Sequence, residues 1–336
     1  MKKLVSLALA AAMTLGLAAC GGQPAAPAPS DSSAAGSAAP MTLTVAYADA
    51  EDSVFGKGVA AFSEKLEELS GGTMTCKIYP NGTLGTISEV SQMLQNGTCD
   101  VSPIVTSSLT SSCPDLGVFD LPFLFKDYAE ARAALDGEAG TTLAEKLSAS
   151  KLHVASWLTM GFREVTSKNA VNTVDEFKNM KIRTQSNEVH MDIFKTLGAS
   201  PTVVNFSELY TALELGTVDG QENPYVNILS NAYYDVNSYL VETNHVFQVA
   251  ALLVGQQTYD KLSDEQRTWV DDAAAYAADV EWTATEADNE QARKSLVEEH
   301  GMTLIEMDHA ALADATASVY DDYKDQYGAL VDIIRG

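Results

Sequence analysis

The feature that most constrains the fold of this chain is an alternation of strand-like and helix-like segments within residues 161–247. Lys181, Ile182 and Arg183 end a run in which apolar and polar residues alternate, as they do in a half-buried strand. The apolar residues that follow recur at helical spacing until Gly198, where a helix can end in a left-handed residue. Residues 201–204 form the next strand-like run. Such alternation is typical of an α/β fold with a parallel sheet.

The N-terminal half shows the same alternation. Strands are expected at residues 43–47, 74–79 and 100–105, and amphipathic helices at residues 54–69 and 87–94 lie between them. A strand–helix–strand–helix–strand order again predicts a parallel sheet.

A long helix is expected towards the C-terminus. Ser263 and Gln266 form a capping box, and no proline interrupts the chain from there to His300. A helix over residues 264–299 would be about 50 Å long, at a rise of about 1.5 Å per residue. That is longer than a single lobe requires. The alternative is two helices joined by a kink.

Length and charge limit the classes of protein and partner. The 336 residues are enough for two lobes of ordinary domain size. The formal net charge of −25 argues against nucleic acid and anionic membrane surfaces as partners, because both require a basic patch. A small anionic ligand is not excluded. Surface charge is screened beyond a Debye length of about 10 Å, so that a local arginine decides the site.

The N-terminus has the pattern of a lipoprotein signal peptide over residues 1–20. Two lysines precede an apolar stretch that is too short to span a membrane, and Leu17, Ala18 and Ala19 precede Cys20 as in a lipobox. Cleavage would leave a lipidated Cys20 at the new N-terminus. The alternative is an ordinary secretory peptide with a chance cysteine. Residues 21–40 consist almost entirely of Ala, Pro, Ser and Gly and predict a flexible tether.

Motifs for catalysis or metal binding are absent from the sequence. It contains no GxSxG, no HExxH and no phosphate-binding glycine loop. Besides Cys20 the chain has Cys76, Cys99 and Cys113, an odd number, which we interpret as small buried residues, with a disulfide as the alternative. The histidines are scattered, and no zinc site is suggested. We therefore expect a binding protein without a cofactor and not an enzyme, because binding needs a clamp and a shape but no tuned acid–base pair.

Arg183 is a candidate binding residue because it follows a predicted strand. In open α/β sheets, ligands bind outside the carboxyl ends of the strands. An arginine is always charged and therefore needs a partner in a cleft. The partner is either a ligand carboxylate, held by two parallel hydrogen bonds, or a nearby Asp or Glu of the protein.

Several segments resemble one family closely. GFREVTSK, TVDEFKNMKIR, LGASPTVVNFSELYTALELGTVDGQENP and ETNHVF, with the spacing between them, are similar to the solute receptors of TRAP transporters, the DctP-like family. The resemblance covers nearly all of the chain after residue 41. It implies a two-lobed periplasmic-binding-protein-like fold with a central ligand cleft and a long helix that spans both lobes. Residues 41–160 with 249–288 would form lobe I, and residues 161–248 with 289–336 would form lobe II.

The resemblance also implies the residues of the site. Arg183 would clamp the ligand carboxylate, Arg163 would support it as a second cation, and Asn223 would donate its amide. Phe206 would form an apolar wall. The residues expected to face them from lobe I are Tyr47, Val105 and Thr106. Residues 84–89, LGTISE, depart from an acidic and basic pair that many relatives carry, which would alter one side of the pocket.

The implied function is that of an extracytoplasmic receptor that binds a small organic acid and delivers it to the TRAP membrane subunits. We expect a monomer, lipid-anchored in the periplasm or on the outer face of the cell membrane. The alternatives are a receptor for a neutral or aromatic solute and a secreted α/β enzyme. Some relatives bind their acid together with a cation. Glu222 beside Asn223 offers only one carboxylate, which does not make a site, so no metal is predicted.

The lipid anchor predicts the behaviour of one variant. Cys20→Ser should release the mature protein from membranes, because no thiol remains to carry the lipid. Membrane fractionation and mass spectrometry of the N-terminus measure this. A wild-type protein that is already free of membranes and carries no lipid would contradict the prediction.

Overall fold

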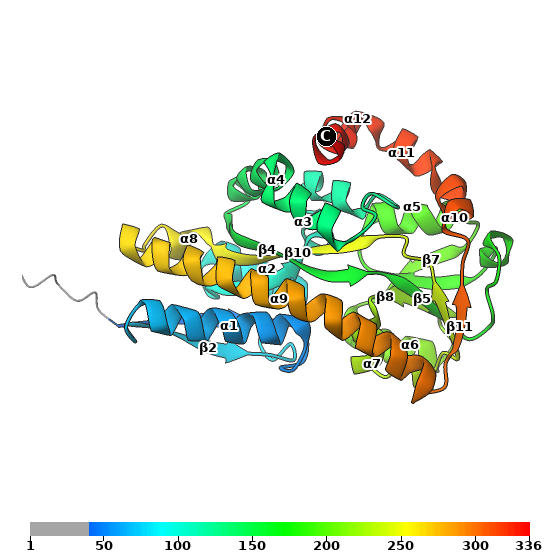
Figure 1. The fold of residues 1–336 in the computed structure, drawn as a ribbon, viewed down its shortest axis with the longest axis horizontal. Coiled ribbons are helices and arrows are strands. Elements are labelled where there is room, and N and C mark those ends of the chain that lie inside the picture. The colour runs from blue at the N-terminus through cyan, green and yellow to red at the C-terminus, as the bar shows by residue number, and fades with distance from the viewer. Residues whose placement is uncertain (1–39) are drawn as a thin grey trace, which may run out of the picture. The chain divides into compact units, whose positions relative to one another are not determined.

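The computed structural model describes residues 40–336, which contain two β-sheets (Figure 1). The predicted signal peptide, Cys20 and residues 21–39 of the tether lie outside the described residues. Within the described part, no helix combines the length and the apolar character needed to cross a membrane.

The first sheet has five strands in the order β2-β1-β3-β10-β4. The predicted parallel pattern is confirmed for β1 with β2 and β3, whereas β10 runs antiparallel to both β3 and β4. Two of its crossover helices are α1 (Val54–Leu69) and α2 (Ile87–Asn96). The strands are β1 (Met41–Ala46), β2 (Met74–Tyr79), β3 (Val101–Val105), β4 (Leu152–Phe162) and β10 (Phe247–Gly255).

The second sheet has six strands in the order β11-β9-β5-β8-β6-β7. Its helices include α5 (Glu188–Thr196), which ends before Gly198; that glycine has φ +79°, as its predicted role at a helix end requires. The helices α6 (Leu209–Glu214) and α7 (Tyr225–Ser230) flank β8 in the sequence. The strands are β5 (Glu164–Ser167), β6 (Lys181–Thr184), β7 (Ser200–Val203), β8 (Gly220–Asn223), β9 (Tyr239–Glu242) and β11 (Thr303–Glu306).

Strand β8 was not predicted from the sequence, although it lies inside the second sheet between β5 and β6. Its sequence is GQEN, and all four residues are buried. A strand this polar can be buried only if its side chains are hydrogen-bonded; Gln221, for example, donates to the Thr166 hydroxyl at 3.0 Å. A side chain at position 220 would collide with Met180 and with the Thr166 carbonyl, which explains the glycine.

Within the described residues the chain passes three times from one sheet to the other, and the first two of these crossings are adjacent. Strand β4 belongs to the first sheet and β5 to the second, with Arg163 between them. Residues 243–246 carry the chain back from β9 to β10. The backbone amide of Arg163 donates to the Val246 carbonyl at 2.9 Å, so the two crossings lie side by side.

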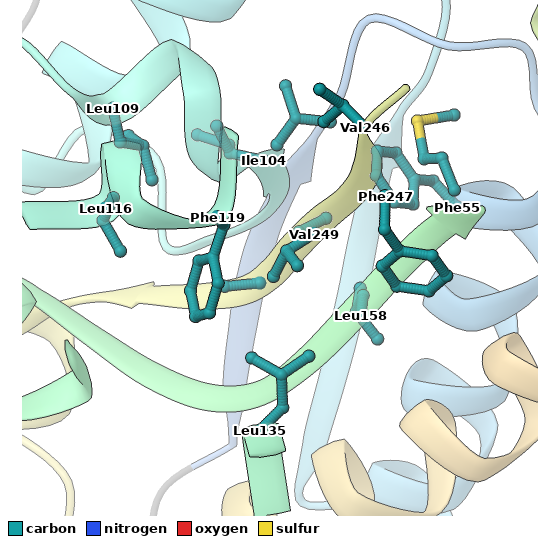
Figure 2. Close-up of a cluster of buried hydrophobic side chains, with 14 of the residues drawn as sticks. Phe55, Ile104, Leu109, Leu116, Phe119, Leu135, Leu158, Val246, Phe247 and Val249 are labelled. Carbon is teal, nitrogen blue, oxygen red and sulfur yellow. The ribbon is translucent and has the colours of Figure 1, made fainter. Parts of the chain in front are cut away.

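The core of the first sheet is built around β10, whose residues are all buried. Figure 2 shows side chains of β10 and β4 meeting others from β3, α1 and the segments after β3. Burial of each large apolar side chain contributes roughly 1.5–3 kcal/mol, so this sheet is a firm support for the loops at its edge. The cysteines Cys76, Cys99 and Cys113 are all free thiols; the last two are buried, and Cys76 is partly buried.

The predicted long helix is α9 (Asp264–Glu298), and its capping box is present. It packs against α1 and β4 and, nearer its C-terminal end, against α7 of the second-sheet side (Figure 1). Ala273, Ala274, Ala277 and Ala278 are buried on it, and such small side chains allow close approach of its neighbours. The helix is continuous, so the alternative of two kinked helices is wrong.

Several shorter helices complete the fold. Before β4 lie α3 (Tyr128–Asp136) and α4 (Glu138–Ala149), which are divided at Gly137. Between β10 and α9 lies the short helix α8 (Gln256–Tyr259). Short 3-10 helices span Thr106–Leu109, Pro114–Asp120, Val174–Phe177, Phe206–Glu208 and Tyr233–Asp235.

The C-terminal helices contact elements from both sheets. α10 (His309–Thr316) and α11 (Ser318–Asp322) pack against α5. α12 (Lys324–Arg335) instead packs against α4 and the Pro114–Asp120 helix, where the Tyr327 hydroxyl donates to the Pro114 carbonyl at 3.0 Å. Residues expected in lobe II thus contact residues expected in lobe I.

The buried carboxyl group of Glu281 on α9 predicts a pH-dependent stability. Its oxygens accept hydrogen bonds from the Thr159 amide at 3.3 Å and the Thr285 hydroxyl at 3.0 Å, and burial raises its pKa from 4.5 to about 8. Folding therefore takes up a proton between pH 4.5 and about 8. The contribution of Glu281 to the free energy of unfolding falls as the pH rises through this range.

Glu281→Gln should remove this penalty. Urea unfolding measures the free energy of unfolding of the variant and of the wild type at two pH values. The variant should exceed the wild type by about 2 kcal/mol more at about pH 7.5 than at about pH 5. Glu286→Gln, an exposed site on the same helix, is the control. An equal difference between Glu281→Gln and the wild type at both pH values would mean that Glu281 is not protonated in the folded protein.

Candidate functional site

A cavity of about 740 Å³ lies between the two sheets. From the first sheet it is lined by residues at the ends of β1 and β3, among them Tyr47 and Val105. From the second sheet it is lined by residues at the ends of β6, β7 and β8, among them Arg183, Phe206 and Asn223. The cavity thus lies where α/β sheets bind ligands, outside the carboxyl ends of their strands.

Arg183 is buried at the cavity wall, with 4% of its surface exposed. Its Nε donates to the Val204 carbonyl at 2.9 Å. No carboxylate of residues 40–336 forms an ion pair with it. Of the two partners that the sequence left open, a nearby Asp or Glu is therefore not found among these residues. Burial lowers the pKa of Arg183 to about 10, with Glu222 opposing and Arg163 adding to this effect. The guanidinium nevertheless stays charged at neutral pH.

Arg163, in contrast, is fully occupied by protein groups. It forms a buried ion pair with Glu222, its Nη2 donates to Glu222 Oε1 at 2.9 Å, and its Nη1 donates to Gln248. Nη2 also approaches Asn223 Oδ1 at 3.3 Å. The position of Arg163 at the crossing from β4 to β5 explains why it can reach β8 and β10 together.

Glu222 connects Arg163 to two buried histidines. Its Oε2 lies 3.5 Å from His190 Nδ1 and 3.3 Å from His245 Nε2. Burial alone would raise the Glu222 pKa, but Arg163 and His190 outweigh it and hold the pKa well below its usual range. Asp120 lies 3.0 Å from His190 Nε2 and, with Glu222, raises the His190 pKa despite burial.

These contacts also decide whether Glu222 can bind a cation. Both of its carboxylate oxygens are engaged by Arg163, and the histidines crowd one of them. Among residues 40–336, no group of three or more His, Cys, Asp or Glu side chains has an arrangement that could hold a metal ion.

The other predicted site residues differ in position. Asn223 lines the cavity, and its amide nitrogen donates to Gln221 Oε1 at 2.5 Å. Tyr47, Val105 and Phe206 line the cavity as well. Thr106 does not: it is fully buried, and its hydroxyl donates to the Val249 carbonyl at 3.1 Å.

Residues 85–89 form part of one wall of the cavity. Glu89 is occupied in capping α2, because its Oε2 accepts from the Thr86 amide at 2.7 Å and from the Thr86 hydroxyl at 2.9 Å. This part of the wall therefore carries no cationic side chain.

Sequence reasoning missed many of the polar residues that line the cavity, among them Asp49, Asn227 and Tyr233. Asp49 follows β1 closely, so the rule that polar residues at strand ends form sites could have found it. Asn227 lies on α7, and Tyr233 begins a short 3-10 helix. No spacing in the sequence connects these two residues to a strand end.

The class of protein follows from this arrangement. A cavity between two α/β sheets, lined by a buried arginine that pairs with no carboxylate of residues 40–336, is typical of a receptor for a small solute. The chain matches the family model DctP, bacterial extracellular solute-binding protein family 7, over residues 45–328, and it belongs to this family.

Solved and curated relatives agree with this. A TRAP periplasmic solute-binding protein from Polaromonas sp., bound to D-erythronate, is 33% identical, with a TM-score of 0.85 over 88% of this chain and 98% of that one. The sugar acid binding protein DctPAm from Advenella mimigardefordensis, in complex with galactonate, is 32% identical, with a TM-score of 0.85 and the same coverage. The C4-dicarboxylate-binding periplasmic protein DctP of Rhodobacter capsulatus is 31% identical over 87% of this chain and 89% of its own length. The predicted fold class, two-lobed with a long helix, is confirmed.

The ion pair between Arg163 and Glu222 predicts a large loss of stability on one substitution. Glu222→Gln leaves Arg163 buried without a counter-charge, which should lower the free energy of unfolding by about 3–5 kcal/mol in urea denaturation. Glu214→Gln, an exposed site on α6, should not change it measurably. A loss below about 1 kcal/mol for Glu222→Gln would show that the pair contributes no more than a surface pair.

Proposed function

We propose that this chain is the extracytoplasmic receptor of a TRAP transporter and binds a small organic acid through Arg183. The observation that carries the proposal is the buried guanidinium of Arg183, which lines the cavity and has no carboxylate partner among residues 40–336. A ligand carboxylate would supply the missing charge through two parallel hydrogen bonds.

The size of the cavity and the ligands of relatives support a small acid. About 740 Å³ lies within the range of small-molecule sites, roughly 300–1,000 Å³. The relatives from Polaromonas and Advenella were solved with D-erythronate and galactonate, and one from Sulfurospirillum deleyianum was solved with succinate. All three ligands carry a carboxylate.

The neighbours of Arg183 have separate roles in this proposal. Arg163 holds Asn223 and Glu222 in place and adds positive potential, but its own hydrogen bonds are used within the protein. Asn223 has a second amide hydrogen free for the ligand. Phe206, Tyr47 and Val105 shape the walls, and Thr106 supports the first-sheet wall from behind.

Delivery of the ligand would use movement of the lobes. Lobe I (residues 41–160 and 249–288) and lobe II (161–248 and 289–336) would close on the ligand around the crossings at Arg163 and at residues 243–246, as in hinge closure around a fixed site. The continuous helix α9 contacts both sides and would limit the range of this motion. The lipid on Cys20 would keep the receptor near the TRAP membrane subunits.

A thermal-shift and turnover measurement tests the proposal. Galactonate, D-erythronate or succinate should raise the melting temperature of the protein, because a ligand that binds only the folded state stabilises it. The ligand should be recovered unchanged. Consumption of the acid by pure protein would support the enzyme alternative, and a response only to neutral or aromatic solutes would contradict the carboxylate clamp.

Arg183→Lys gives the sharpest prediction. Lysine keeps the charge but cannot form two parallel hydrogen bonds. Loss of one charge-assisted contact costs about 1.5–3 kcal/mol, so affinity for the acid should fall roughly ten- to a hundredfold by calorimetric titration.

The melting temperature of unliganded Arg183→Lys should hardly change. Arg132→Lys, at a site on α3 that does not line the cavity, is the matched control and should retain full affinity. Unchanged affinity of Arg183→Lys would mean that Arg183 does not bind the ligand carboxylate. Unfolding of the unliganded variant would mean that Arg183 is needed for the stability of the fold.

A further inference from the structure

We infer that Asp49, Asn227 and Tyr233 form a subsite for ligand hydroxyl groups that excludes a second carboxylate, so that this receptor selects polyhydroxy monocarboxylates over dicarboxylates. The inference rests on the proposed function and specifies the class of acid.

The positive charges of the cavity provide the first argument. Among the described residues that line it, the only cationic side chains are Arg163 and Arg183, with no lysine or histidine. Arg163 is neutralised by its ion pair with Glu222. One uncompensated cation remains, Arg183, which matches one carboxylate on the ligand. A dicarboxylate would have to desolvate its second carboxylate without a cation to meet it.

Asp49 makes that second carboxylate more unfavourable. No cation within residues 40–336 forms an ion pair with Asp49. Burial raises its pKa to about 6, opposed by a hydrogen bond from Asn227, so the carboxyl is ionised at neutral pH. A ligand carboxylate beside it would meet a like charge, whereas a hydroxyl group could donate to it.

Asn227 and Tyr233 show that the cavity wall here requires hydrogen-bonding partners. Asn227 Nδ2 donates to Asp49 Oδ1 at 3.3 Å, which fixes the orientation of the amide, because a carboxylate only accepts. Asn227 Oδ1 and the Tyr233 hydroxyl are buried and have no hydrogen-bond partner among residues 40–336. Their residues are 5% and 1% exposed, and both line the cavity.

The three groups together define the chemistry of the ligand at this position. The Asp49 carboxylate and Asn227 Oδ1 can only accept hydrogen bonds, and the Tyr233 hydroxyl can donate or accept. A carboxylate offers no donor, whereas neighbouring hydroxyl groups both donate and accept. An unpaired buried polar group costs about 1–3 kcal/mol. A ligand carboxylate, which leaves these acceptors unpaired, should therefore bind here more weakly than hydroxyl groups do.

The position of Tyr233 links the subsite to the clamp. Burial raises the pKa of its hydroxyl; the positive charges of Arg183 and Arg163 oppose this, and Asp49 adds to it. The Tyr233 hydroxyl is buried at the wall of the same cavity that Arg183 and Asp49 line. A polyhydroxy chain with its carboxylate on Arg183 would place its hydroxyl groups along Tyr233 towards Asp49.

The test uses pairs of acids that differ only at one terminal carbon. Galactonate and galactarate form one pair, and D-erythronate and meso-tartrate form the other; in each, a terminal CH₂OH is replaced by a carboxylate. In calorimetric titration at neutral pH, the wild type should bind the monocarboxylate of at least one pair at least about tenfold more tightly than its dicarboxylate. Asp49→Asn should reduce this ratio to about threefold or less, because the amide removes the repulsion and can donate to a carboxylate.

Two further variants keep the result interpretable. Asp52→Asn makes the same chemical change at an exposed position that does not line the cavity, and it should leave the ratio unchanged. Tyr233→Phe removes only the hydroxyl. It should lower the affinity for the monocarboxylate several-fold and the affinity for the dicarboxylate less. This variant tests the subsite even if Asp49→Asn does not fold.

The outcomes separate this inference from the proposed function. If the monocarboxylates bind and Arg183→Lys weakens them, but the dicarboxylates bind equally well or Asp49→Asn leaves the ratio intact, the subsite is wrong and the clamp stands. If none of the four acids binds the wild type but succinate does, the subsite is wrong and the carboxylate receptor stands. A response only to neutral or aromatic solutes overturns both.

Discussion

The buried ion pair between Arg163 and Glu222 is the interaction on which the rest of the site depends. Arg163 lies where the chain passes from the first sheet to the second, and Glu222 lies on β8 inside the second sheet. Around them, Gln248 on β10 and His190 on α5 complete a network that contacts both sheets. Removing either charge would leave the other buried without a partner, so the network holds the crossing and the cavity wall in one arrangement.

The two arginines of the site differ in the protein groups that surround their guanidinium groups. Both are almost completely buried, with 3% of Arg163 and 4% of Arg183 exposed. Arg163 has a carboxylate, an amide and a carbonyl of the protein around it, and its contribution is to fix the geometry. Within residues 40–336, Arg183 has one hydrogen bond, to a backbone carbonyl, and no ion pair, so its other donors remain available at the cavity wall. Burial would strengthen an interaction of this guanidinium with an anion, because an interaction between charges is stronger away from water.

Much of the fold was predictable because its signals are local. The helix α9 follows from a capping box and an absence of proline, and the first three strands follow from their alternation with amphipathic helices. Strand β8 could not be predicted in this way, since GQEN carries no apolar periodicity, and its burial depends on partners such as Thr166 and Arg163 that lie far away in the sequence. The same reason explains α12, whose contact with the α4 side depends on tertiary packing alone.

The sequence by itself determined the alternating α/β architecture, the resemblance to the family, and Arg163, Arg183 and Asn223 as three of the polar residues that line the cavity, because the motifs that carry each of these are continuous segments of the chain. Only the tertiary structure decided which arginine is neutralised, that Thr106 stands behind the wall, and that Asp49 meets Asn227 across the cavity. The free or paired state of a buried charge depends on every group within a few ångströms of it. Those groups come from strands and helices that are brought together only when both sheets have formed.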